Sequence, residues 1–199
     1  MSDRQDKVIR YVKKHGIVRP RDLRDLGILP EDMRRLCQKG LLVRVSRGLY
    51  ELPDGEPDPN QSLIEVCKQA PKGVICLLSA LRFHGIGTQL PHEVWLAIPA
   101  KAARPRIKKP KVRIVYLSGR MFSEGIEEYK RPGGKIRVYG VVKTIVDCFR
   151  FRNQIGTDIA VEALRDALRN RKATIAQLSD MAKTCRAETV MRPYLEAMI

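Results

Sequence analysis

The stretch PEDMRRLCQKGLLVRVSRGLYEL, residues 30–52, decides the fold of the first part of the chain. Pro30 is typical of a first helical position, the two acidic residues after it favour the positive end of a helix, and Gly40 is typical of a helix end. Residues 41–52 are rich in β-forming side chains on both sides of a Ser-Arg-Gly turn, which predicts a hairpin. The stretch therefore predicts a helix followed by a β-hairpin.

Two further helical patterns precede this stretch. The first covers residues 3–15 and ends at Gly16, and the second begins at Pro20 and ends at Gly27. Three helices followed by a β-hairpin is the order of a winged helix-turn-helix. Proteins of this class mostly bind DNA, although some bind RNA or other proteins.

The predicted third helix has two chemically different faces. At about 100° per residue, Met33, Leu36 and Cys37 share one face, while cations and an amide share the other. Arg pairs with guanine and Gln with adenine in the major groove, and the remaining basic residues of the unit are placed to reach phosphates. A solvated charged face is the alternative. The predicted DNA-binding residues are Arg19, Arg21, Arg34, Arg35, Gln38, Lys39, Arg44 and Arg47.

Charge divides the 199-residue chain, whose formal net charge is +16. Residues 1–52 carry a net charge of +6, and residues 61–199 carry +13. Residues 53–60 lie between them with a net charge of −3, three prolines and no apolar side chain, which is typical of a linker. We therefore expect a DNA-binding domain over residues 1–52 and a larger domain over residues 61–199. The surplus of cations suits a polyanion such as nucleic acid, and anionic membranes or acidic proteins are alternatives.

The larger domain has the pattern of an α+β fold. Helical patterns cover residues 62–70 and, with a mixed character, 74–84. Strand patterns occur at residues 93–98, 112–117, 126–131 and 135–139, and from residue 141 onward the pattern is helical. Strands followed by helices favour the α+β class. The whole chain is thus predicted to be a winged helix-turn-helix followed by a mixed domain that ends in a helical segment.

A basic loop lies between the first two of these strands. It carries seven cations and no acid, and its two prolines prevent a regular helix. Such a loop suits phosphate contact without sequence recognition, and a solvated hairpin loop is the alternative. The cations of this predicted second basic surface are Lys101, Arg104, Arg106, Lys108, Lys109, Lys111 and Arg113.

The sequence offers little for catalysis. HExxH, a P-loop, a Rossmann GxGxxG and metal-binding Cys/His spacing are all absent, so we expect no catalytic residue, no metal and no cofactor. Glu128 and Lys130 resemble the end of a nuclease motif, which leaves a metal-dependent nuclease as a third hypothesis. We expect a cytoplasmic protein without membrane contact. The five cysteines are scattered, no apolar run is long enough to cross a membrane, and the sequence shows no secretion signal.

Several stretches resemble AbiEi-type antitoxins, the repressor-antitoxins of type IV toxin–antitoxin and phage abortive-infection systems. The first is RRLCQKGLLVRVSRGLY at residues 34–50, which many winged-helix regulators share. The resemblance continues through LSALRFHG at 78–85 and EVWLAIP at 93–99. Its most specific parts are KTIVDCFRFRN at 143–153 and VEALRDAL at 161–168.

The resemblance implies a two-part function. The winged helix would bind inverted repeats in double-stranded DNA at the chain's own promoter and repress transcription. The second domain would neutralise a partner toxin of nucleotidyltransferase type without forming a stable complex with it. Lys143, Asp147 and Arg150 are helical neighbours, so they form either an antitoxin surface or, as the spacing favours, an intrahelical ion pair.

Two functions from other classes remain beside this one. The runner-up is a solitary transcription regulator whose larger domain senses a ligand or mediates dimerisation. The nuclease hypothesis is the third. A nucleotidyltransferase gene next to this one favours the antitoxin, and metal-dependent cleavage of nucleic acid favours the nuclease.

Overall fold

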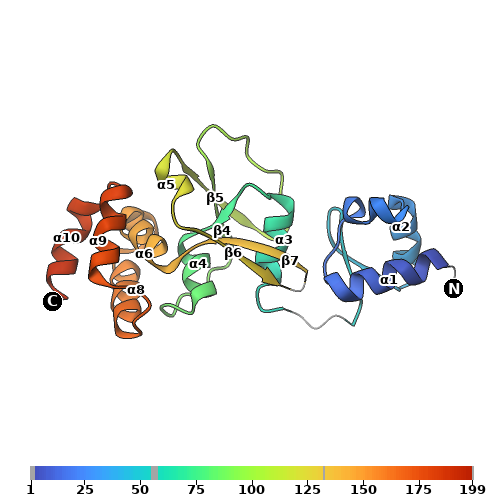
Figure 1. The fold of residues 1–199 in the computed structure, drawn as a ribbon, viewed down its shortest axis with the longest axis horizontal. Coiled ribbons are helices and arrows are strands. Elements are labelled where there is room, and N and C mark those ends of the chain that lie inside the picture. The colour runs from blue at the N-terminus through green and yellow to red at the C-terminus, as the bar shows by residue number, and fades with distance from the viewer. Residues whose placement is uncertain (1–2, 55–57, 132, 199) are drawn as a thin grey trace.

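A computed structural model of the chain describes residues 3–54, 58–131 and 133–198. Figure 1 shows a small N-terminal unit on the right, a body built on a β-sheet in the middle, and a group of helices near the C-terminus on the left. This is the predicted combination of N-terminal helices with a larger mixed α+β body.

The N-terminal unit has the element order that the sequence predicts. Its elements are α1 (Asp3–His15), the 3₁₀ helix η1 (Pro20–Leu26), α2 (Pro30–Gln38), β1 (Val43–Ser46) and β2 (Leu49–Glu51). The second helix is of the 3₁₀ type, because its first turn closes with a bond from the Asp22 N–H to the Arg19 carbonyl and only seven residues lie before the left-handed Gly27.

Acidic side chains fix where the second and third helices begin. The Asp32 carboxylate accepts a hydrogen bond from the Leu29 N–H at 3.0 Å, and the Asp22 carboxylate accepts one from the Arg19 N–H at 2.9 Å. Both contacts satisfy a backbone donor that a helix start leaves free. Gly27 and Gly40 follow the two helices with φ of 69°, which confirms the predicted left-handed ends.

A third extended segment adds to the hairpin of this unit. Val18, between α1 and η1, bridges Tyr50 of β2 in antiparallel fashion. The Val18 N–H donates to the Tyr50 carbonyl at 2.9 Å, and the Tyr50 N–H donates to the Val18 carbonyl at 3.0 Å. Both residues are buried in the apolar core of the unit, together with Val8 of α1 and Met33 and Leu36 of α2. The bridge ties the loop after α1 to the second strand of the hairpin.

The body is built on a five-stranded sheet of order β5-β4-β3-β7-β6. Its pairs β4–β5 and β3–β7 are parallel, whereas β3–β4 and β6–β7 are antiparallel. The strands are β3 (Val74–Ile75), β4 (Val94–Pro99), β5 (Val112–Leu117), β6 (Ile126–Arg131) and β7 (Gly134–Tyr139).

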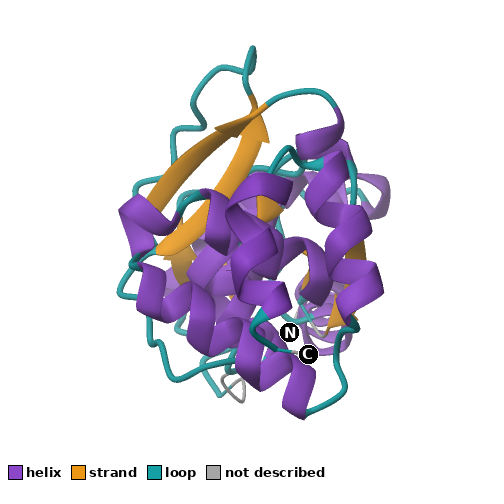
Figure 2. Ribbon diagram, turned by 90° about the vertical axis from the view of Figure 1, so that its left-hand side faces the viewer, coloured by secondary structure: helices purple, strands orange, loops and turns teal. Residues whose placement is uncertain are grey.

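Helices cover both faces of this sheet. Because successive side chains of a strand point to opposite faces, Leu96 of β4 packs with Ile64 of α3, while Trp95 packs in the cluster that contains Phe149 of α6. Figure 2 shows the helices of the cluster that contains Phe149 in front of the strands. The helices are α3 (Gln61–Gln69), α4 (Leu77–His84), α5 (Arg120–Ser123), α6 (Val141–Arg150), α7 (Arg152–Ile155), α8 (Thr157–Arg169), α9 (Ile175–Thr184) and α10 (Glu188–Glu196).

The N-terminal unit and the body share apolar contacts. Ile17 and Leu49 of the unit are buried in the same cluster as Ile64 of α3 and Ile136 of β7. The predicted linker at residues 53–60 connects the two parts, and its residues 55–57 lie outside the described part of the chain. The division into residues 1–52, 53–60 and 61–199 stays a prediction.

Candidate nucleic-acid interface

The exposed face of α2 carries the side chains that the sequence predicts there. Arg34, Arg35, Gln38 and Lys39 are exposed, while Met33 and Leu36 are buried. Arg34 forms an ion pair with Glu31 at 2.7 Å on the helix surface. An exposed pair of this kind contributes little to stability, so the guanidinium stays available to a partner at small cost.

Three of the four predicted phosphate contacts outside α2 are exposed. Arg21 at the start of η1 is exposed, as are Arg44 on β1 and Arg47 in the turn of the hairpin. The Arg44 side chain donates to the Ser46 carbonyl at 3.3 Å, which draws it along the hairpin. Arg47 projects from the turn that the left-handed Gly48 permits. These three cations are free to approach an anionic surface.

Arg19 has a different place from the one expected. Its guanidinium pairs with Asp22 at 3.3 Å and donates to the main-chain carbonyl of Lys68 at 2.6 Å. The Lys68 ammonium in turn donates to the Ile17 carbonyl and lies 4.0 Å from the Asp22 carboxylate. Burial lowers the pKa of Lys68 to about 8, and the nearby Asp22 opposes that shift. Arg19 thus lies in the contact between the unit and the body.

The basic loop runs along the sheet and is not a hairpin loop. Because β4 and β5 are parallel, residues 100–111 must return from the end of β4 to the start of β5. Figure 2 shows this connection rising above the strand ends. All seven cations of the predicted second basic surface are exposed. Among these seven side chains, that of Arg113 has close partners, since it pairs with Glu93 at 3.2 Å and lies 4.6 Å from the Trp95 ring centroid.

A groove between the N-terminal unit and the body is a basic feature that the sequence does not predict. We call it the junction groove, and it has a volume of about 300 Å³. Cations from the end of α1, from α3 and from the β6–β7 hairpin meet there, with Asp22 as an acidic member of the lining. Its basic side chains are Lys14, His15, Lys68, Lys130, Arg131 and Lys135. Residues so far apart in the chain become neighbours only when the unit docks on the body.

The predicted antitoxin surface at Lys143, Asp147 and Arg150 is wrong as a surface. Lys143 and Asp147 are each 1% exposed and form an ion pair inside the helix, the alternative that the spacing favours. Burial raises the pKa of Asp147, and the Lys143 ammonium opposes that shift. The half-buried Arg150 donates to the Cys185 carbonyl at 2.8 Å and so links α6 to the end of α9. The helix buries these groups because α4, α8 and α9 pack around it.

The residues of the nuclease hypothesis lie on the β6 edge of the sheet. Glu128 pairs with Lys135 and Arg137 of β7, each at 3.3 Å. Within residues 3–54, 58–131 and 133–198, no three His, Cys, Asp or Glu side chains gather in a way that would hold a metal ion. The geometry around Glu128 is that of cross-strand ion pairing.

Comparison with known proteins finds a family model that matches the N-terminal unit. Residues 6–53 match the AbiEi antitoxin family. The model of that family describes a transcriptional regulator, AbiEi antitoxin, and the match runs from α1 to the end of the hairpin. The resemblance to AbiEi antitoxins is thus confirmed for this part of the chain. The AbiEi match supports a DNA-binding antitoxin and regulator, which is not typically an enzyme.

The fold of the whole chain also has a solved counterpart. The crystal structure of the RV2827C protein from Mycobacterium tuberculosis aligns with a TM-score of 0.62 and 14% sequence identity, over 98% of this chain and 82% of that one. At this identity the likeness shows the fold alone. No curated protein matches the chain. Among the described helices, none is long and apolar enough to cross a membrane.

Proposed function

We propose that this chain represses its own operon by binding inverted repeats in double-stranded DNA, and that it acts in the cytoplasm as the antitoxin of a nucleotidyltransferase-type toxin in phage defence. The observation that carries the proposal is the exposed face of α2, where Arg34, Arg35, Gln38 and Lys39 lie opposite a buried apolar face. The AbiEi match over residues 6–53 supports it independently.

The N-terminal unit acts as a winged helix-turn-helix in this proposal. The bridge between Val18 and Tyr50 supports the assignment, because it adds a strand-like segment between α1 and η1 to the β1–β2 hairpin. Helix, short strand, two helices and a hairpin is the order of that fold. Helix α2 then enters the major groove, where Arg35 and Gln38 read base edges. Arg47, in the wing, contacts the phosphate backbone.

The body contributes cations to the same DNA in this proposal. The basic loop carries exposed lysines and arginines, and the junction groove gathers further basic side chains beside the unit that reads the sequence. Contacts of this kind release counterions without depending on base sequence. They strengthen operator binding and make it more sensitive to salt.

The antitoxin role rests on the resemblance of residues 143–153 and 161–168 to AbiEi-type antitoxins. In the folded chain the first of these stretches lies largely inside α6, where Lys143 and Asp147 are buried. These two residues therefore hold the helix in place and leave neutralisation to the exposed surface around it. We propose that neutralisation proceeds without a stable complex with the toxin.

A genetic experiment tests both halves of this function. The neighbouring gene is induced alone and together with this chain, and growth is measured beside a reporter driven by the operon promoter. We expect this chain to relieve growth arrest and to silence the reporter. In the Arg35→Ala, Gln38→Ala double variant we expect repression to be lost while growth is still rescued. A chain that neither rescues growth nor represses the reporter contradicts the proposal.

The runner-up, a solitary regulator that senses a ligand, is favoured by one observation. The body contains a small polar cavity close to the linker. A neighbouring gene that encodes no nucleotidyltransferase, combined with repression that responds to a small molecule, would favour this function over the antitoxin.

A further inference from the structure

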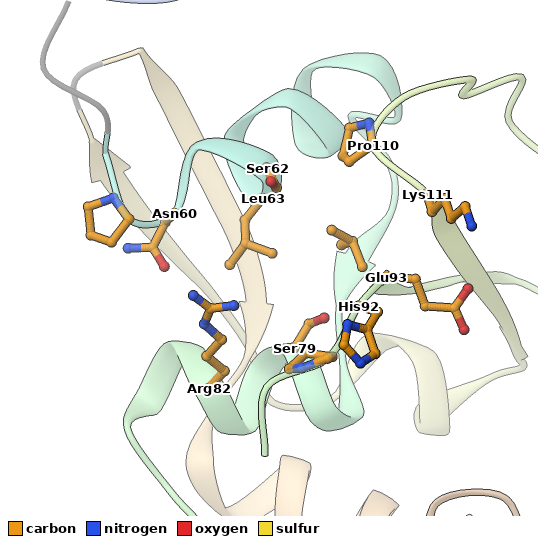
Figure 3. A pocket seen from close by; sticks show the side chains of 12 residues that line it. Asn60, Ser62, Leu63, Ser79, Arg82, His92, Glu93, Pro110 and Lys111 are labelled. Atoms are coloured by element: carbon orange, nitrogen blue, oxygen red, sulfur yellow. The ribbon is translucent and has the colours of Figure 1, made fainter. Parts of the chain in front are cut away.

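A polar cavity of about 150 Å³ lies in the body where the linker enters α3. An apolar cavity of about this volume in another protein holds benzene, so the space suits a ligand of a few non-hydrogen atoms. Figure 3 shows side chains from the end of the linker, from α3, from α4 and from the segment before β4 gathered around it. Its polar side chains include Asn60, Ser62, Ser79, Arg82 and His92.

The charge around this cavity is not balanced from within. In Figure 3, Arg82 extends from α4 toward Asn60, while the Glu93 carboxylate lies at the opposite side of the cavity. Glu93 pairs with Arg113 at 3.2 Å, outside the cavity lining. Arg82 is exposed, and its guanidinium forms no hydrogen bond or ion pair with the residues that the structure describes, although its main-chain carbonyl accepts one from the Gly85 N–H. The guanidinium therefore faces a polar space without an anionic partner.

A buried hydroxyl adds a hydrogen-bond donor on the floor of the cavity. Ser79 is 3% exposed, and its Oγ accepts a hydrogen bond from the Trp95 N–H at 3.0 Å. Within the described residues its hydroxyl proton has no hydrogen-bond acceptor, and Figure 3 shows the oxygen directed into the cavity. Asn60, which precedes α3, and Ser62, in its first turn, contribute an amide and a hydroxyl at the positive end of that helix. Donors from four segments thus converge on one small space.

We propose that this cavity binds a small oxyanion, a phosphate or a carboxylate, with Arg82 as its principal partner. The planar guanidinium offers two parallel N–H groups, which match two oxygens of either anion. Ser79, Asn60 and His92 donate to the remaining oxygens. Because Asn60 closes the linker and Arg82 belongs to α4, a bound oxyanion ties the end of the linker to the body. The volume of about 150 Å³ suits an anion of a few non-hydrogen atoms, such as free phosphate or acetate.

Titration of the full chain tests this site. Amide chemical shifts are followed by NMR while sodium phosphate or sodium acetate is added, with sodium chloride at matched ionic strength as the reference. We expect saturable shifts at Asn60, Ser79 and His92 with at least one of the two oxyanions. The anion that saturates at the lower concentration identifies phosphate or carboxylate as the preferred ligand.

Variants of matched charge separate the site from general attraction to a basic protein. Arg82→Ala removes the charge-assisted bonds and should weaken binding about tenfold or more, whereas Arg82→Lys keeps the charge and should weaken it less. Arg24→Ala removes an exposed arginine of η1, far from the cavity lining, and should leave the affinity unchanged. Shifts that never saturate with either anion, or equal affinities of Arg82→Ala and Arg24→Ala, would overturn the proposal. None of these outcomes depends on DNA binding.

Discussion

The Arg19 guanidinium donates a hydrogen bond to the main-chain carbonyl of Lys68 across 2.6 Å, and this contact joins the N-terminal unit to the body. The Lys68 ammonium returns a bond to the Ile17 carbonyl, so two side chains close a ring of polar contacts over a shared apolar cluster. The orientation of α2, the helix proposed to read bases, relative to the basic surfaces of the body depends on this junction.

The junction should respond to pH through Lys68. Burial lowers its pKa in the folded chain from 10.5 to about 8. Between these two values the unfolded chain binds more protons at this residue than the folded chain does, so its contribution to stability rises with pH and is smallest below about pH 8. We expect the Lys68→Met variant to lose this rise.

Urea denaturation of both proteins across this pH range measures the effect. Buried thiols act in the opposite direction, because burial raises the pKa of Cys148 and Cys76 above that of an unfolded cysteine. The difference between the wild type and Lys68→Met is therefore the quantity to compare. Parallel profiles of unfolding free energy against pH for the two proteins would contradict a lowered pKa of Lys68 in the folded chain.

The linker should be the first place where protease cuts. Residues 53–60 carry no apolar side chain, and the described residues 53, 54 and 59 are exposed. We expect limited proteolysis to release a fragment that begins near residue 61 and keeps a cooperative melting transition. Aggregation of that fragment would show instead that Ile17 and Leu49, which are buried in the apolar cluster shared with the body, are needed for the body to fold.

Substitutions in α2 and in the wing should weaken DNA binding in different ways. Arg35→Ala should reduce discrimination between operator and scrambled DNA, at a cost of about 1–3 kcal/mol in operator binding. Arg47→Ala should weaken binding to both sequences and lower the salt dependence by about one phosphate contact. Arg192→Ala on α10 is the control, since that exposed residue pairs with Glu188 of the same helix. Unchanged affinity in both variants would contradict the proposed contacts.

The basic loop should act through charge alone. Replacing Lys101, Lys108 and Lys109 with Gln removes three exposed cations and leaves Lys111, which lines the cavity, in place. Operator affinity should fall and its dependence on salt should flatten, because fewer counterions are released. Discrimination against scrambled DNA should stay the same. If operator affinity depended on salt as steeply in this variant as in the wild type, the loop would serve another partner.

The buried ion pair of α6 should matter for stability rather than for recognition. Lys143→Met leaves the Asp147 carboxyl buried without its partner, which typically costs about 3–5 kcal/mol of unfolding free energy. The double variant Lys143→Met, Asp147→Leu should recover most of that loss, because it replaces the pair with apolar volume. Urea denaturation midpoints measure both effects. A Lys143→Met protein as stable as the wild type would contradict a structural role.

Local patterns carried most of the fold prediction. Glycine and proline positions located the helices of the N-terminal unit, and short runs rich in β-forming residues located β4 and β5, because these signals depend on a few neighbouring residues. The type of η1 was missed, since a 3₁₀ and an α-helix of seven residues share the same local signals. The parallel pairing of β4 with β5 was also missed, because loop composition does not encode strand direction.

The candidate site was less accessible to sequence reasoning. The exposed face of α2 followed from helical periodicity alone. Arg19 was assigned to DNA because nothing local shows that the Lys68 carbonyl, 49 residues away, takes its guanidinium. Lys143 and Asp147 were expected as a surface or an ion pair, and only the packing of α4, α8 and α9 around α6 decides between the two. The cavity beside Arg82 depends on four separate segments, so no motif signals it.

Equilibrium binding of the full chain to its own operon promoter tests the central claim most directly. Fluorescence anisotropy with the promoter duplex and with a scrambled duplex of equal length, at several salt concentrations, gives both affinity and specificity. We expect the promoter to bind on the order of a thousandfold more tightly than the scrambled duplex, and both affinities to fall as salt rises. Equal affinity for the two duplexes at every salt concentration would contradict it.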